Sequence, residues 1–199
     1  MSEPTPALHP AQNRALRECY AFTRQLGDHW QALASRLGPG PLADALATGG
    51  EVAEELLAEL GARTETYGLF GRPAAQSVGL GIAGARSAVA DRALERNQAA
   101  RLAVLDGQHV ATLLAYLASL ARANHDDALA GWCEAWERRL SAEVDAVRRA
   151  AIATGDDPDR AIVPADPGPL GRAGVATATA LGTFGEWFDR RTSRGKGGG

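Results

Sequence analysis

The stretch of sequence that decides the fold is RSAVADRALERNQAARLAVLDGQHVATLLAYLASLARAN, which covers residues 86–124. It contains no proline and is rich in alanine and leucine. Its apolar residues recur at steps of three and four, the period of an amphipathic helix. We expect Asp91 to mark a helix boundary and one helix to continue from there to Asn124. The segment Asp106-Gly107-Gln108-His109 places an acid and a histidine three residues apart near the middle of this helix.

The rest of the chain shows the same helical period, and no run alternates with the period of two that a strand would need. The further predicted helices cover residues 7–37, 41–70, 74–90 and 126–154. Gly49 and Gly50 weaken the second of these helices and allow either the close approach of a neighbour or a kink. The predicted fold is therefore all-α, with four principal helices, a short crossing helix over residues 74–90 and an extra C-terminal helix. The connection near residue 125 is short, so the two helices beside it should be antiparallel neighbours.

The chain divides into a bundle and flanking segments. The predicted segments are a disordered lead (1–6), the bundle (7–155), a proline-rich linker (156–169), an amphipathic C-terminal helix (170–191) and a flexible tail (192–199). The C-terminal helix has small residues along one face, and it carries Phe184, Trp187 and Phe188 near its end. These three aromatic residues are the candidate partner-binding group. The helix either packs back on its own bundle or supplies an interface, and the sequence leaves both arrangements open.

Composition excludes several classes of protein. The chain has 199 residues, of which 45% are hydrophobic, and its net charge of -3 provides no basic surface for nucleic acid. No apolar run is long enough to span a bilayer, and the first residues do not resemble a signal peptide. The two cysteines, Cys19 and Cys133, fall on apolar helical stripes, where cysteine acts as a small hydrophobic residue. These features predict a cytoplasmic protein.

The pair Asp106 and His109 is the strongest candidate for chemistry. If Leu113 is the centre of the inward face and each residue turns about 100°, both side chains lie within roughly 40° of that centre. An acid and a histidine at this spacing, projecting into a bundle, have the geometry that di-iron carboxylate proteins use as Glu-x-x-His. The alternative is a polar pair in the core that holds no metal.

A series of motifs between residues 42 and 151 resembles the ferritin-like superfamily, and within it the small stress-associated YciE/YciF-like proteins. The motifs are Glu54-Glu55-Leu56-Leu57, Tyr67-Gly68-Leu69-Phe70-Gly71-Arg72-Pro73, Gly79-Leu80, Val89-Ala90-Asp91-Arg92-Ala93-Leu94, Tyr116-Leu117-Ala118-Ser119-Leu120-Ala121 and Asp126-Asp127. The resemblance covers over half of the chain and consists mostly of pattern and spacing. It implies an antiparallel four-helix bundle of ferritin-like type and an iron or manganese site built from glutamates of several helices.

Few positions of this sequence carry a residue that could serve as one of the metal ligands that the resemblance implies. The matching positions offer Asp106, His109 and Glu137 as the metal residues. In the first helix, Glu18 and His29 lie about 60–80° off the apolar stripe. In the second helix, Glu54 and Glu55 are on the outer face and Arg63 is near the seam. The convergent ligands therefore fall short of what a di-iron centre uses, which predicts a degenerate or altered site.

These observations lead to three hypotheses about function. The first is a non-catalytic ferritin-like bundle, without a cofactor, that forms a homo-oligomer or binds a protein partner. Its link to stress follows from the resemblance alone. The alternative is a metal-dependent oxidase or iron-handling protein that holds iron or manganese through the Asp-x-x-His pair. A second alternative is association with a membrane surface through residues 171–196, which are apolar on one face and basic at the end.

Overall fold

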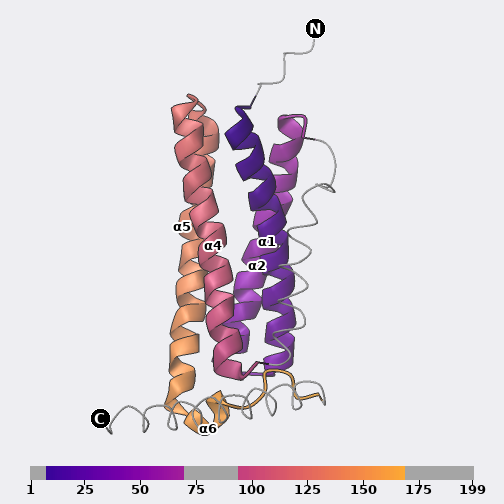
Figure 1. Ribbon diagram of the computed structural model, residues 1–199, viewed down its shortest axis with the longest axis vertical. Coiled ribbons are helices and arrows are strands. Elements are labelled where there is room, and N and C mark those ends of the chain that lie inside the picture. Colours follow the sequence, from indigo (N-terminus) through magenta and orange to yellow (C-terminus); the bar gives the residue numbers. More distant parts are fainter. Residues whose placement is uncertain (1–7, 70–93, 169–199) are drawn as a thin grey trace, which may run out of the picture.

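A computed structural model describes residues 8–69 and 94–168, and four long helices make up most of this part of the chain (Figure 1). The helices are α1 (Pro10–Leu37), α2 (Pro41–Thr66), α4 (Arg96–Ala123) and α5 (Asp127–Ala153). A short 3-10 turn, η2 (Thr154–Asp156), and the single turn α6 (Pro158–Ala161) follow α5. The described residues form no strand, and the predicted all-α bundle is confirmed.

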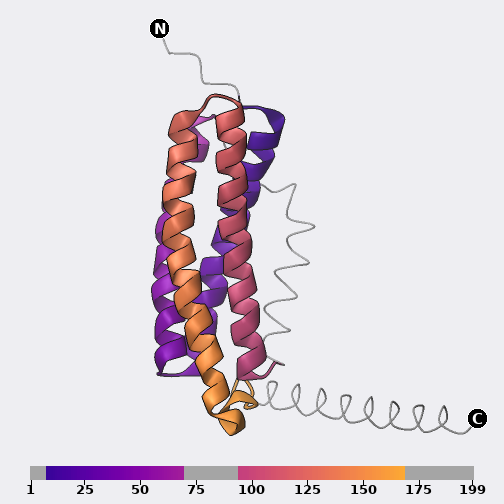
Figure 2. The same ribbon diagram turned by 90° about the vertical axis from the view of Figure 1, so that its left-hand side faces the viewer.

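The four helices run along the same long axis (Figures 1 and 2), and each packs against two neighbours. Helix α1 lies between α2 and α4, and α5 lies on the opposite side of the same pair. Helices α2 and α5 run in opposite directions, because contacts later in α2 are made with residues earlier in α5. Glu55 of α2 contacts Arg139, whereas Glu59 contacts Trp132. All neighbouring helices are antiparallel, as predicted. The diagonal pairs, α1 with α5 and α2 with α4, are parallel.

The parallel diagonal α2 and α4 fixes the topology. At one end of the bundle, the Tyr67 hydroxyl that follows α2 donates to Asp126 Oδ2 at 2.6 Å. At the other end, Arg96 at the start of α4 donates to the carbonyl of Leu37 at 2.9 Å. The connection from α2 to α4 therefore joins opposite ends of the bundle. The crossing helix predicted over residues 74–90 lies outside the described residues, as do the lead and the C-terminal helix.

The segment predicted as a linker closes the end of the bundle where α1 finishes and α4 begins, which we call the base. The amide of Ala165 donates to the Leu94 carbonyl and the amide of Arg96 to the Val163 carbonyl, both at 2.9 Å. Ala165 is completely buried. Val163 and Ala165 therefore attach this segment to the start of α4 by backbone hydrogen bonds.

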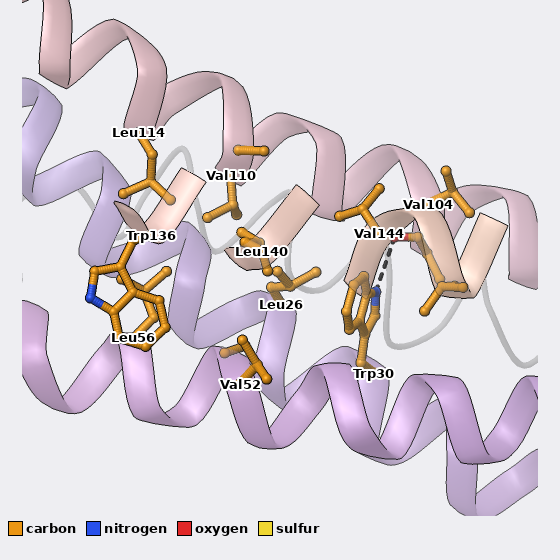
Figure 3. Packing of buried hydrophobic residues seen from close by; sticks show 14 of the residues in the cluster. Leu26, Trp30, Val52, Leu56, Val104, Val110, Leu114, Trp136, Leu140 and Val144 are labelled. Atoms are coloured by element: carbon orange, nitrogen blue, oxygen red, sulfur yellow. Dashed lines mark hydrogen bonds between the residues drawn. The ribbon is translucent and has the colours of Figure 1, made fainter. Parts of the chain in front are cut away.

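Trp30 is the largest fully buried side chain of the core, and its indole meets the other helices at close range (Figure 3). Its Nε1 donates to the carbonyl of Ala103 at 3.0 Å. A Cβ atom placed on Gly49 would come within 2.6 Å of the indole, and one on Gly107 within 2.7 Å. Both positions therefore need glycine. The close approach predicted for Gly49 is the arrangement observed.

The inward face of α4 differs from the predicted one. The buried positions include Ala103, Gly107, Val110 and Leu114, so the face is centred near Leu114, about 100° from the expected centre at the preceding residue. Leu102, predicted to lie inside, is 40% exposed. The prediction was wrong because it followed the largest side chains, whereas the residues that face the core are mostly small.

We expect Gly107→Ala to destabilise the bundle by about 1–3 kcal/mol, because the new methyl group collides with the Trp30 indole and with Val144. This loss exceeds the roughly 1 kcal/mol that alanine gains over glycine as a helix former. Chemical denaturation monitored by circular dichroism measures the change.

The matched control is Gly131→Ala in α5, where an added Cβ meets nothing within 4 Å. It should leave stability unchanged or raise it by up to about 1 kcal/mol. Equal stability of the two variants would contradict the proposed constraint.

Candidate functional site

Asp106 is paired across the bundle. Its Oδ2 lies 2.8 Å from Nδ1 of His29, which joins α4 to α1. The His29 side chain is buried, so the prediction that it lies well off the inward stripe of α1 was wrong. A carboxylate accepts a hydrogen bond from a ring nitrogen and fixes the orientation of the imidazole. The pair therefore acts as a polar clasp between the two helices.

His109 is not part of this clasp. Its ring is exposed and stacks edge-on against Phe22 of α1, with ring centroids 4.5 Å apart. With the inward face centred on Leu114, His109 lies about 140° from that centre and Asp106 about 80°. The predicted sharing of the interior face by Asp106 and His109 is therefore incorrect. Turning α4 by about one residue moves both side chains away from the interior, Asp106 to the boundary with α1 and His109 to the surface.

Glu137, the third predicted metal ligand, accepts a hydrogen bond from Ser141 of its own helix at 3.0 Å. Asp106, His109 and Glu137 thus have three different sets of neighbours. Among the residues of the two described ranges, no group of three His, Cys, Asp or Glu side chains is placed to hold a metal ion. The described residues therefore do not bring the predicted ligands together.

A second polar cluster, missed in the sequence, joins α2 to α5. Glu59 Oε2 accepts hydrogen bonds from the indole Nε1 of Trp132 at 2.7 Å and of Trp136 at 2.8 Å. These two bonds, with the nearby Arg63 and Arg139, lower the pKa of the Glu59 carboxyl. Arg63 stacks over Trp132 at 4.9 Å and Arg139 over Trp136 at 4.7 Å. The partners lie 73 and 77 residues apart, so no local pattern could indicate them.

Both cysteines are fully buried free thiols, as their positions on apolar stripes predicted. Burial is the main cause that raises the pKa of each thiol to about 12. A thiol with so high a pKa carries almost no thiolate near neutral pH, and thiolate is the reactive form. Cys19 and Cys133 therefore serve as core residues.

The outer side of α4 carries a second apolar stripe, which we call the outer seam. Its members are Leu102, Leu105, His109, Leu113, Tyr116 and Leu120. They recur at steps of three and four and fall within an arc of roughly 80°. Leu105 is 57% exposed and Tyr116 is 52% exposed. The predicted partner-binding group Phe184, Trp187 and Phe188 lies outside the described residues.

No model of a known protein family, no curated protein and no solved structure matches the chain. The resemblance to the ferritin-like superfamily remains a prediction from sequence motifs. Within the part of the chain that the structure describes, no helix is both long enough and apolar enough to cross a membrane. The class that the described residues define is an all-α four-helix bundle, with a partly buried polar clasp between α1 and α4 and an apolar outer seam on α4.

Asp106→Ala should destabilise the bundle by about 1–3 kcal/mol, because it removes the acceptor that faces Nδ1 of the buried His29. Chemical denaturation at neutral pH measures the loss. The control is Gln108→Ala, which changes an exposed side chain two residues away and should stay within about 0.5 kcal/mol of the parent. Equal effects of the two substitutions would contradict a clasp.

The buried thiols predict a dependence on pH and a resistance to alkylation. Since the folded pKa is raised from 9.0 to about 12, the contribution of the neutral thiols is fully present below about pH 9. It is lost as the pH rises from there toward 12, because the unfolded chain ionises first.

At pH 8, iodoacetamide should label both cysteines rapidly in denaturant and only slowly in the native protein. Rapid native labelling of either thiol would contradict this burial.

Proposed function

We propose that this chain is a non-catalytic helical-bundle protein that acts by self-association or partner binding, with the outer seam of α4 as its contact surface. The observation that carries the proposal is the exposed seam. Apolar residues at alternating steps of three and four form the stripe by which one helix packs against another. A seam of this kind on the outside of a completed bundle favours a further helix as its partner.

The charge distribution supports the same surface. Residues 107–121 contain no Asp, Glu, Lys or Arg, although a large part of this stretch faces outward. Helix α5 differs, because exposed charged residues such as Arg138, Asp145 and Arg148 recur along its outer side. Contact surfaces are depleted of charge at their centre, whereas solvated helix faces are rich in it. The difference between the two helices favours α4 as the interface.

The bundle topology supports a ferritin-like relationship, which we include in the proposal. One long connection joins the parallel helices α2 and α4, and ferritin-like bundles also have a single long crossover. The separation of Asp106, His109 and Glu137 favours a non-catalytic member of this group. The two buried free thiols accord with a cytoplasmic location. An association with stress follows from the sequence resemblance and is part of the same proposal.

A second copy of the chain is the occupant we expect on the outer seam, with two α4 helices related by a two-fold axis. Leu105→Glu places a charge at the most exposed leucine of the seam. It should raise the protein concentration at which half of the chains are associated by at least about tenfold, which corresponds to roughly 1.4 kcal/mol. Analytical ultracentrifugation over a range of concentrations measures this shift.

The control is Ile152→Glu, which changes a 63% exposed residue on α5, away from the seam. It should leave the association unchanged, and both variants should keep the thermal stability of the parent monomer. A parent chain that remains monomeric above about 1 mM would exclude self-association. Equal weakening by both substitutions would place the contact elsewhere.

A further inference from the structure

A cavity of about 180 Å³ lies at the base of the bundle, between the α1–α2 turn and the end of α5. Leu37, Leu42, Ala150 and Ala153 give it a largely apolar wall. In another protein, an apolar cavity of about 150 Å³ binds benzene. The space at the base is therefore large enough for one small ring or a short aliphatic chain.

Two arginines line the same cavity. The Nη2 atom of Arg96 donates to the Leu37 carbonyl at 2.9 Å, whereas its Nε is shielded from solvent and has no acceptor. Within the two described ranges, neither Arg96 nor Arg160 forms an ion pair. Arg96 and Arg160 both line the cavity, and burial, followed by the charge of Arg160, lowers the pKa of Arg96. Two cations at one cavity, neither with a carboxylate partner among the described residues, favour the binding of an anion.

The charges of the side chains that line the cavity favour a ligand with a single negative charge. Besides the two arginines, the lining contains one carboxylate, Asp157, whose Oδ1 accepts from the backbone amide of Arg160 at 3.1 Å. Two positive groups and one negative group leave a single positive charge. The N-terminus of α2 also borders the cavity, and its N-cap Gly40 provides no side-chain cap. The positive end of that helix dipole adds to the attraction for an anion.

We propose that the cavity at the base binds a small apolar carboxylate. Its carboxylate group pairs with Arg96 and Arg160, and its ring or chain fills the apolar part. A carboxylate suits this place because guanidinium groups bind it with parallel, charge-assisted hydrogen bonds, and both Arg96 and Arg160 line the cavity. The site lies away from the outer seam of α4, so it stands independently of the proposed contact function.

Benzoate is the probe, and isothermal titration calorimetry on the full chain measures its binding. Benzamide has nearly the same shape without the charge, and inorganic phosphate has charge without the ring. We expect benzoate to bind with one site per chain, and each comparison compound to bind at least about tenfold more weakly. Absence of benzoate binding at concentrations well above about 1 mM, or equal binding of benzoate and benzamide, would overturn the proposal.

Substitutions locate the site. Arg160→Gln removes an exposed guanidinium of the lining and should weaken benzoate binding by about tenfold, since charge-assisted hydrogen bonds are lost. Arg149→Gln, an exposed arginine of α5 outside the lining, should leave binding unchanged. Ala153→Leu fills the cavity and should abolish binding while both arginines remain.

Circular dichroism melting shows whether each variant folds. If Ala153→Leu fails to fold, the two arginine variants decide the outcome, because both change exposed side chains. Equal binding by Arg160→Gln and Arg149→Gln would show that benzoate does not sit against Arg160, and the proposal would be wrong.

Discussion

The contact on which the rest of the bundle depends is that of the Trp30 indole with the backbones around it. Glycines at positions 49 and 107 let α2 and α4 approach the ring, and the Ala103 carbonyl accepts its N–H. A large flat side chain at the centre of four helices requires small residues opposite it. That requirement determines which side of α4 faces inward. As a result, the bulky Leu102 and Leu105 of this helix lie on its exposed side.

The orientation of α4 has consequences for its polar residues. Because Gly107 must face the indole, the residue before it turns about 100° toward α1, where Asp106 meets His29. His109 turns further out and packs on Phe22 at the surface. The acid and the histidine that are neighbours in sequence are thus assigned to different partners. The acid becomes part of a structural clasp, and the histidine becomes part of the outer seam.

The described surface has regions of different chemistry, one between α2 and α5, one along the outside of α4 and one at the base. Glu59 and its two tryptophan partners link α2 to α5 by hydrogen bonds, and Arg63 and Arg139 stack on the two indoles. The outer seam of α4 is apolar and has no comparable polar cover among the described residues. At the base, Arg96 and Arg160 provide charge beside an apolar space. The side of the bundle and its base therefore offer surfaces of different chemistry.

For the described residues, sequence alone predicted the four long helices, their approximate limits and the antiparallel pairing of α4 with α5, because helical period, proline turns and short loops are local properties. It also located the buried cysteines, and at Gly49 it left a close approach or a kink, of which the structure has the close approach. Tertiary structure decided the orientation of α4 and every cross-helix partner. Helix α4 has two faces with similar numbers of apolar residues, so counting apolar residues does not show which face points inward. The large indole of Trp30, 73 residues before Ala103 in the sequence, fits only against the face with small residues. The His29–Asp106 clasp depends on that orientation. The Glu59 cluster joins α2 to α5 through residues far apart in the sequence, which no local pattern encodes.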